Sequence, residues 1–279
     1  MRPAPAKVNL WLNVVGRRDD GYHLLESLVA FVDLADRIEA KASDRLSLDV
    51  EGPLAAHLKD EADNLVLKAA RLLADRAGIS PRAAIRLVKH VPVAAGLGGG
   101  SADAAAALRE LVDLWRVALP QEELFDLAAR LGADVPMCLA GRPAFVSGIG
   151  ERLSWAPPLP ACAVLLVNPN RVLTTRDVFA ARRGAFSPPT PSPAGWRDLA
   201  DLSATLAARG NDLTDAAVSL EPAVGQVLQA LRATDARHVA MSGSGATCFA
   251  LYESTDVARR AASALPAAWW RHVGGFLSI

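Results

Sequence analysis

The chain has 279 residues, enough for one large domain or two of ordinary size, and its 51% hydrophobic content excludes an intrinsically disordered protein. Its 30 basic and 30 acidic residues balance, which argues against a general nucleic-acid binder and against a polybasic membrane protein. No apolar run reaches the length of a membrane span, and polar residues interrupt the N-terminal apolar stretch, so we expect neither a membrane anchor nor a signal peptide.

Strands and helices are predicted in alternation along both halves of the sequence. Alternating or continuously apolar residues predict strands at 8–14, 46–50, 84–91, 161–167, 239–241 and 247–252. Apolar residues at helical spacing predict helices at 64–74, 102–114, 122–131, 224–231 and 257–265. A change of composition at 154–158 is typical of a connector between domains, and four prolines within 187–193 predict an exposed loop. The pattern indicates an α+β or α/β protein with two lobes.

The glycine-rich segment 92–103 is the most informative part of the sequence. Its glycines precede an alanine-rich helical segment and are Gly96, Gly98, Gly99 and Gly100. Glycine lets the backbone approach a ligand closely, and the start of a helix presents unpaired N–H groups and the positive end of its dipole. With Ser101 as the predicted N-cap, the strand, turn and helix suit the phosphates of a nucleotide.

This loop differs from the best-known nucleotide-binding loops. No Gly-Lys-Ser/Thr follows it, so it is not a Walker A loop. Ser101 stands where a dinucleotide fingerprint needs its last glycine, and the His-Arg-Asp and Asp-Phe-Gly signatures of protein kinases are absent. A tight turn without a ligand is the alternative, but three consecutive glycines together with Gly96 favour phosphate binding.

Phosphoryl transfer needs positive charge near the transferred group and a carboxylate that orients the acceptor. Lys7, which precedes the first apolar alternation, and Asp134 are the candidates. Each has an ordinary alternative, because most lysines are exposed and Asp134 could cap a helix that begins near Pro136. The glycine turn at 242–246 could be a simple hairpin turn, and Asn211–Asp212 a helix cap. Sequence spacing alone does not pair Lys7 with Asp134.

A set of motifs in a fixed order carries a resemblance to a known family. They are Pro-Ala-Lys-Val-Asn-Leu at 5–10, Asp-Gly-Tyr-His at 20–23, Gly-Leu-Gly-Gly-Gly-Ser at 96–101, Gly-Ala-Asp-Val-Pro at 132–136 and Ser-Gly-Ser-Gly-Ala at 242–246, with further matches at 63–65, 148–151 and 211–213. Together they closely resemble the 4-diphosphocytidyl-2-C-methyl-D-erythritol kinases, a branch of the galactokinase, homoserine kinase, mevalonate kinase and phosphomevalonate kinase (GHMP) superfamily. The resemblance covers nearly the whole chain.

The resemblance implies an α+β, two-lobed GHMP-kinase fold. The N-terminal ATP-binding lobe, similar to domain 2 of ribosomal protein S5, is expected at 1–155 and a ferredoxin-like C-terminal lobe at 156–279. The implied reaction is the ATP-dependent phosphorylation of the 2-hydroxyl of 4-diphosphocytidyl-2-C-methyl-D-erythritol, in non-mevalonate isoprenoid precursor biosynthesis. Lys7 and Asp134 are implied as catalytic residues, with Asp134 orienting the hydroxyl or accepting its proton. Mg²⁺ is expected from the chemistry, although the sequence indicates no carboxylate ligand for it.

The resemblance also implies two groups of binding residues. The ATP contacts are implied at Asn64, Leu65, Lys89, Pro92, Gly96, Leu97, Gly98, Gly99, Gly100, Ser101 and Ala102. The contacts to the cytidyl substrate are implied at Asn9, Tyr22, His23, Thr175, Phe179, Gly243 and Ser244. Asn64, Leu65 and Lys89 would lie near the adenine and ribose. Tyr22 and Phe179 would stack on the two faces of the cytosine, which His23 would recognise.

Other functions fit only part of this pattern. A homoserine or mevalonate type of GHMP kinase acts on a small acceptor, which gives no reason for a cytosine clamp at Tyr22–His23. A non-catalytic nucleotide-binding regulator would be expected to have lost Lys7 or Asp134. The scattered cysteines favour reduced thiols in a cytoplasmic protein over a zinc site and are Cys138, Cys162 and Cys248. We therefore expect small-molecule partners, no nucleic acid or membrane, and a monomer or weak homodimer.

Overall fold

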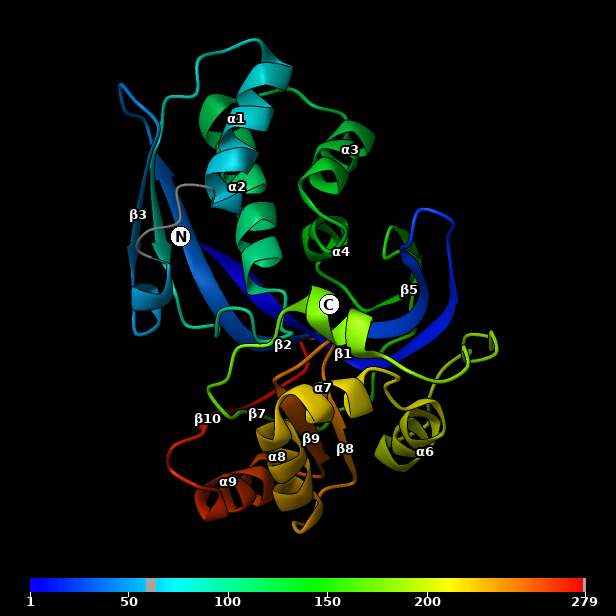
Figure 1. Ribbon diagram of the computed structural model, residues 1–279. Coiled ribbons are helices and arrows are strands. Elements are labelled where there is room, and N and C mark those ends of the chain that lie inside the picture. The colour runs from blue at the N-terminus through cyan, green and yellow to red at the C-terminus, as the bar shows by residue number, and fades with distance from the viewer. Residues whose placement is uncertain (59–63, 278–279) are drawn as a thin grey trace. The chain divides into compact units, whose positions relative to one another are not determined.

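The computed structural model describes residues 1–58 and 64–277, and these form two compact units drawn from separated stretches of sequence (Figure 1). The first unit comprises Met1–Lys7, Leu34–Val93 and Gly98–Gly141, and the second Val8–Asp33, Ala94–Leu97 and Arg142–Ile279. The long strands β1 (Arg2–Arg17) and β2 (His23–Lys41) pair with each other and contribute residues to both units. A single cut after residue 155 would yield two continuous halves instead, so that division into domains stays a prediction.

The first unit combines a sheet with a layer of helices (Figure 1). The last part of β2 pairs antiparallel with β4 (Ala84–Val88), which pairs in parallel with β3 (Ser47–Glu51). Parallel neighbours need a crossover connection, and this one contains η1 (Ala55–His57) and α1 (Leu65–Ala77). The other helices are α2 (Gly99–Trp115), α3 (Gln121–Leu131) and α4 (Val135–Ala140), and both α1 and α4 pack against α2 and α3.

The boundaries of α1 and α2 follow from local capping. The Asn64 side chain accepts a hydrogen bond from the Val66 amide at 2.9 Å and begins α1, which ends at Gly78 in the left-handed conformation. Helix α2 begins earlier than predicted, because Gly98 adopts a left-handed φ of 64° and its carbonyl accepts from the Ala102 amide. Ser101 is therefore not the N-cap but lies within the first turn, a correction to the predicted start.

The second unit contains a sheet of order β10-β7-β9-β8, in which all neighbours are antiparallel. Its strands are β7 (Ala163–Asn168), β8 (His238–Met241), β9 (Cys248–Tyr252) and β10 (Trp270–Gly275). Alternate residues of β7 and β9, such as Leu165 and Ala250, share a buried core with Leu228 of α8 (Pro222–Arg232) and Ala258 of α9 (Thr255–Ala264). Because side chains alternate across a strand, both helices cover the same face of this sheet.

The second unit also contains the first part of β2. That part pairs with β5 (Ala144–Gly148), which pairs with β6 (Arg152–Trp155). Residues 154–158, predicted to connect two domains, lie inside this unit, since Trp155 ends β6 and the segment after it continues in the same unit. The remaining helices are α5 (Thr175–Ala181), α6 (Leu199–Arg209) and α7 (Thr214–Leu220).

The α+β class and most predicted elements are confirmed. Each predicted strand and helix overlaps an observed one, and residues 187–193 have no regular structure, as their prolines predict. Strand β2 carries no clear alternation and received no prediction, although it is 19 residues long. Within the described part of the chain, no helix combines the length and apolarity needed to cross a membrane.

Candidate functional site

Lys7 and Asp134, which sequence spacing cannot pair, lie together in the first unit. The Lys7 Nζ atom is 3.6 Å from Oδ2 of Asp134. Lys7 lies on β1 and its side chain is only 6% exposed, whereas Asp134 precedes α4 and its side chain is 41% exposed. The pair therefore consists of a buried ammonium and a carboxylate that a ligand can reach.

Gly98 explains why the Lys7 side chain runs where it does. A Cβ atom added to Gly98 would lie 2.7 Å from Cγ of Lys7 and 3.0 Å from its Cε. The lysine stem thus packs directly against the backbone at the start of α2, where any larger residue would displace it. Together with its left-handed φ, this contact requires glycine at position 98. The conformation of the glycine loop and the position of the Lys7 side chain therefore depend on each other.

The alternative role for Asp134, a cap of the next helix, is not what the side chain does. Asp134 occupies the N-cap position of α4, but its side chain makes no capping hydrogen bond. Only its backbone carbonyl joins the helix, by accepting from the Cys138 amide at 3.1 Å. The carboxylate is left to face the Lys7 ammonium.

A second lysine near the loop, Lys89, is enclosed by two carboxylates. Its Nζ atom donates to Asp103 at 2.7 Å and to Asp36, and all three side chains are at most 4% exposed. Asp36 also accepts from the amides of His90 and Val91, at 2.5 and 2.8 Å. The cluster connects the residue after β4 to β2 and to α2 near its start. The ammonium implied as an ATP contact is thus directed at Asp36 and Asp103.

The electrostatics of this cluster follow from burial. Burial lowers the pKa of Lys89, but the Asp103 and Asp36 carboxylates outweigh it and raise that pKa above its ordinary value. Burial raises the pKa of Asp103 to about 8, against the opposing effect of Lys89 and with the added repulsion of Asp36. Asp103 Oδ1 is also buried without a hydrogen-bond partner among the described residues. One proton held by Asp103 makes the cluster neutral.

The other implied ATP residues are distributed over the loop and the start of α1. Asn64 caps α1 as described above, and Leu65 lies beside Gly100. In the second unit, Gly96 is pressed against the carbonyls of Ser242 and Gly245, where an added Cβ would come within 2.8 Å of both. Among the implied residues, Leu97 and Ala102 are buried, while Pro92, Gly98, Gly99 and Ser101 are half-buried and Gly100 is exposed. Asp63 of the motif at 63–65 lies outside the described residues.

The second unit brings the aromatic residues of the implied substrate group together. The rings of His23 and Phe179 stack, with centroids 5.0 Å apart and planes inclined by 26°. Tyr22, the neighbour of His23, is 62% exposed. Burial lowers the pKa of His23, helped by the charges of Arg17 and Arg182, so the imidazole is neutral near pH 7.

The polar members of this group are held by hydrogen bonds within the second unit. The Asn9 side chain donates to Ser27 at 2.8 Å, and the Asn9 amide donates to Ser242 Oγ at 3.1 Å. The hydroxyls of Thr175 and Ser244 lie 3.1 Å apart. The turn at 242–246 does join β8 to β9 as a hairpin, and its Gly243 carbonyl accepts from Asn211. These contacts tie the turn to β1 and α5.

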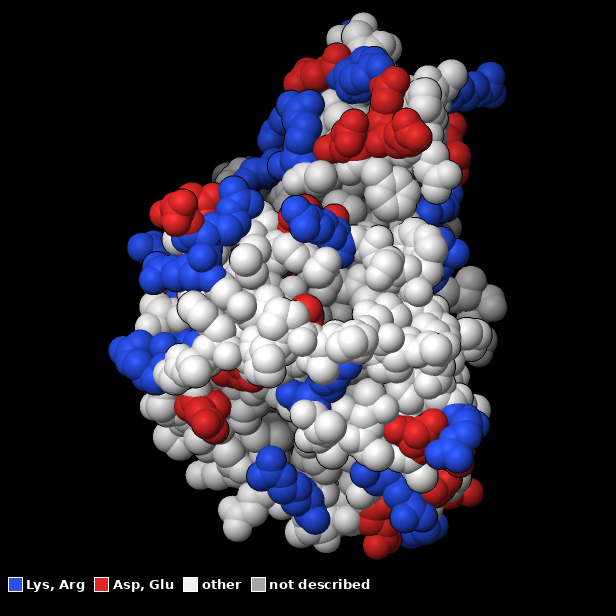
Figure 2. Space-filling view, turned by 90° about the vertical axis from the view of Figure 1, so that its right-hand side faces the viewer, with Lys and Arg blue, Asp and Glu red and all other residues white. Residues whose placement is uncertain are grey.

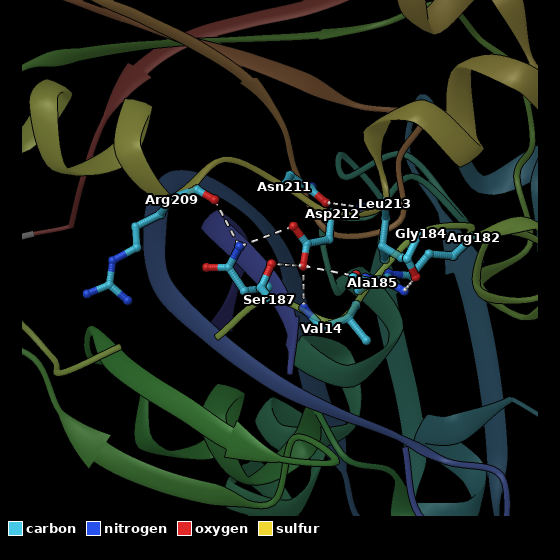
Figure 3. A network of polar contacts seen from close by, with 10 residues as sticks. Val14, Arg182, Gly184, Ala185, Ser187, Arg209, Asn211, Asp212 and Leu213 are labelled. Atoms are coloured by element: carbon cyan, nitrogen blue, oxygen red, sulfur yellow. Dashed lines mark hydrogen bonds and ion pairs between the residues drawn. The ribbon is translucent and has the colours of Figure 1, made fainter. Parts of the chain in front are cut away.

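Asn211 and Asp212 are the residues whose importance was missed in the sequence. Leu213, and neither Asn211 nor Asp212, occupies the N-cap position of α7. Figure 3 shows Asp212 at the centre of a polar network that includes Val14, Ser187 and Arg182. The motif at 211–213 was the available signal, but its partners come from segments far away in the sequence.

Two further properties of the described residues are the arrangement of side chains that could ligate a metal and the distribution of charge. Among residues 1–58 and 64–277, no group of three or more His, Cys, Asp or Glu side chains is arranged to hold a metal ion. Basic and acidic side chains are interspersed on the face drawn in Figure 2, with uncharged areas between them. This mixture agrees with the balanced composition of the chain.

Known proteins resemble this chain over both of its halves. Residues 64–142 match the family described as GHMP kinases N terminal domain, and residues 194–271 match GHMP kinases C terminal. A 4-diphosphocytidyl-2-C-methyl-D-erythritol kinase of Paramagnetospirillum magneticum is 55% identical, with 96% of this chain and 95% of the relative covered. One from Ruegeria pomeroyi is 50% identical, with 96% and 95% covered.

Solved structures agree with these relatives. A crystal structure of 4-(cytidine 5'-diphospho)-2C-methyl-D-erythritol kinase is 39% identical and has a TM-score of 0.81, covering 99% of this chain and 98% of the other. A homoserine kinase from Cytophaga hutchinsonii, at 19% identity and a TM-score of 0.70 over 97% and 92% of the chains, shares the fold alone. The chain therefore belongs to the 4-diphosphocytidyl-2-C-methyl-D-erythritol kinases of the GHMP kinase family.

Proposed function

We propose that this small-molecule kinase transfers the γ-phosphoryl group of ATP to the 2-hydroxyl of 4-diphosphocytidyl-2-C-methyl-D-erythritol. The observation that carries the proposal is the pairing of Lys7 with Asp134 at 3.6 Å, beside the glycine that begins α2. Phosphoryl transfer asks for a positioned carboxylate and for positive charge near the transferred group. Membership of the family supports the choice of substrate.

In this mechanism Asp134 orients the acceptor hydroxyl and takes its proton as the new O–P bond forms. The bond between the γ-phosphorus and the β,γ-bridging oxygen of ATP breaks, and ADP leaves. Its exposed carboxylate can meet the hydroxyl, while Lys7 fixes it from the buried side. The Lys7 ammonium also stabilises negative charge on the transferred phosphoryl oxygens. Because the transition state is loose, correct placement of these groups matters more than a strong base.

The start of α2 is proposed as the site for the ATP phosphates. The helix has 17 residues, and its first N–H groups have no partners within the helix. The segment 98–101 therefore presents backbone N–H donors and the positive end of the helix dipole to a bound phosphate. Lys89, which is implied near the adenine and ribose, contacts α2 from the protein interior through Asp103.

Recognition of the cytosine is proposed for His23, Tyr22 and Phe179. A neutral imidazole offers one hydrogen-bond donor and one acceptor, which suits the mixed edge of a cytosine ring. The low pKa of His23, caused by burial first and by Arg17 and Arg182 second, keeps the ring in that form. Phe179 provides an aromatic face already aligned with His23, and exposed Tyr22 is free to cover a base.

Mg²⁺ is expected with ATP, but the described residues do not supply a protein cage for it. Mg²⁺ commonly keeps several waters and binds one or two carboxylates together with substrate phosphates. Asp134 is the exposed carboxylate beside the loop, and it already faces Lys7. We assign no protein ligand to the metal.

A coupled assay for ADP with purified protein, ATP and the cytidyl substrate tests the proposal. Phosphorus NMR of the product locates the new phosphate, which we expect on the 2-hydroxyl. Homoserine and mevalonate serve as competing acceptors, and ATP alone measures background hydrolysis. Absence of ADP above that background, or faster turnover of homoserine or mevalonate, would overturn the proposed function.

The remaining expectations belong to the same proposal. The protein is expected to act in the cytoplasm, and its cysteines at 138, 162 and 248 are free thiols, as such a compartment permits. Its partners are expected to be ATP and the cytidyl acceptor, without nucleic acid or membrane, and its state a monomer or weak homodimer. Sedimentation velocity with and without substrates measures that state.

A further inference from the structure

Asp212 gathers hydrogen bonds from segments that are far apart in the sequence (Figure 3). Its Oδ2 atom accepts from the Val14 amide and from the Ser187 hydroxyl, both at 2.7 Å, and its Oδ1 atom accepts from Asn13 at 3.3 Å. The Ser187 amide in turn donates to the Val14 carbonyl at 2.9 Å. One carboxylate thus fastens the segment after α5 to strand β1.

Arg182 connects this carboxylate to the end of α5. Its Nη2 atom lies 4.0 Å from Asp212 and donates to the Ala185 carbonyl at 2.6 Å, while Nη1 donates to Gly184 at 3.3 Å. The side chain is only 7% exposed, and its Nε atom has no hydrogen-bond partner among the described residues. A buried guanidinium is costly without a countercharge, and Asp212 supplies one.

Asn211, the residue before Asp212, holds the other end of α5. Its side chain donates to the carbonyls of Met241 and Gly243, at 2.8 and 2.9 Å. The next residue of that turn, Ser244, contacts the hydroxyl of Thr175, the first residue of α5. The dipeptide 211–212 therefore restrains α5 at its beginning through the turn and at its end through Arg182.

Phe179 lies on α5 between these two attachments. Its ring meets His23 at 5.0 Å, and His23 begins β2, the strand that pairs with β1. Arg182, three residues after Phe179, is close enough to lower the pKa of His23. The position of the Phe179 ring relative to His23 thus depends on how the end of α5 is held.

We propose that Asp212 is a positioning residue for recognition of the cytosine, which it controls by holding Arg182 and the segment after α5 so that Phe179 faces His23. The inference rests on the proposed function, because it concerns the base of that acceptor. Asp212 touches neither reacting group in this scheme. Its loss affects binding of the cytidyl moiety more than the chemical step.

The test compares Asp212→Asn with Asp215→Asn. Asp212→Asn keeps the shape of the side chain but removes the charge that Arg182, Ser187 and Val14 share. We expect the KM for the cytidyl acceptor, and the Kd for CDP measured by calorimetry, to rise about tenfold, the effect of one lost charged hydrogen bond. The KM for ATP and the kcat should change by less than about threefold. Asp215 is exposed on α7, and its variant should match the wild type.

A third variant, Ser187→Ala, removes only the hydrogen bond that the Ser187 hydroxyl donates to Asp212 and leaves the ion pair with Arg182 in place. It tests the inference with a folded protein if Asp212→Asn does not fold. It should raise the same two constants about threefold and in the same direction. Unchanged CDP affinity in the folded variants, or an equal rise in the KM for ATP, would overturn the inference while the proposed function stands. A wild-type protein that neither binds CDP nor consumes ATP with the cytidyl acceptor would instead overturn the proposed function.

Discussion

The first unit contains two lysine–aspartate groups that differ in exposure. Lys7 meets Asp134 at 3.6 Å, and the carboxylate of that pair is 41% exposed. Lys89 is bound by Asp36 and Asp103, and none of these three side chains is more than 4% exposed. The first group has a carboxylate that a substrate can reach, whereas both carboxylates of the second group are buried around Lys89. Exposure, not residue type, separates the proposed catalytic pair from the buried cluster.

Both groups meet at the start of α2. The stem of Lys7 packs on Gly98, and an added Cβ at Gly99 would lie 3.5 Å from Nζ of Lys89. Both lysines therefore reach the start of α2. The aspartate that pairs with Lys7 is exposed, whereas those that pair with Lys89 are buried. We expect substitutions of Lys7 and Asp134 to affect turnover, and substitutions of Lys89, Asp36 and Asp103 to affect stability.

The largest effect is expected for Asp134→Asn. Loss of the carboxylate that orients the hydroxyl should lower kcat about 10³-fold, a common magnitude for a positioned general base. The thermal midpoint should stay close to the wild-type value, because the side chain is half exposed. Asp126→Asn, an exposed aspartate on α3, is the matched control in the same assay. Near-normal turnover of Asp134→Asn would remove Asp134 from the mechanism.

Lys7→Met should lower kcat by about 10²-fold, since a cation aimed at developing charge is removed from a sheltered position. The methionine stem still fits against Gly98, so the loop should keep its shape. Steady-state kinetics with both substrates separate kcat from KM, and Lys41→Met, at an exposed lysine of β2, is the control. A change in the KM for ATP with unchanged kcat would show that Lys7 contributes to binding only.

Lys89→Met should act on stability. It leaves the buried Asp36 and Asp103 side chains without their cation, and breaking a buried ion pair in this way costs about 3–5 kcal/mol of unfolding free energy. Urea unfolding followed by circular dichroism measures the loss, and kcat of the folded variant should fall far less than in Lys7→Met. An unchanged unfolding midpoint would mean that the cluster does not support the fold.

The smallest effect expected is a change in the pH dependence of stability with Asp103→Asn. Burial raises the pKa of Asp103 to about 8, so between its ordinary value and pH 8 the native protein holds a proton that the unfolded chain has released. This contribution to stability is complete at acid pH and declines as the pH rises towards 8. Urea midpoints from pH 5 to 8.5 should fall less steeply in Asp103→Asn than in the wild type. Parallel curves for the two proteins would contradict the prediction.

Local sequence rules predicted much of the fold and of the candidate site. Asn64 caps α1 and Gly132 ends α3 because capping depends on a few neighbouring residues. The same rules misplaced the start of α2, because Gly98 in the left-handed conformation is the N-cap and Ser101 lies inside the helix. They also missed β2, in which residues 27–32 are buried without interruption and the buried position 36 in the alternating part is an aspartate.

The glycine loop and the motifs around Lys7 and Asp134 predicted phosphate binding and candidate catalytic residues without a structure. This was possible because glycine conformations, helix starts and charge types are properties of short segments. The burial of Lys89 and the hydrogen bonds of Asp212 could not be predicted in this way. Lys89 lies next to the loop in sequence, yet it is buried by carboxylates that lie 53 and 14 residues away. Asp212 is 198 residues from the amide that it binds on β1. Burial and hydrogen bonding between distant segments arise only when the chain is folded, so these two assignments required the tertiary structure.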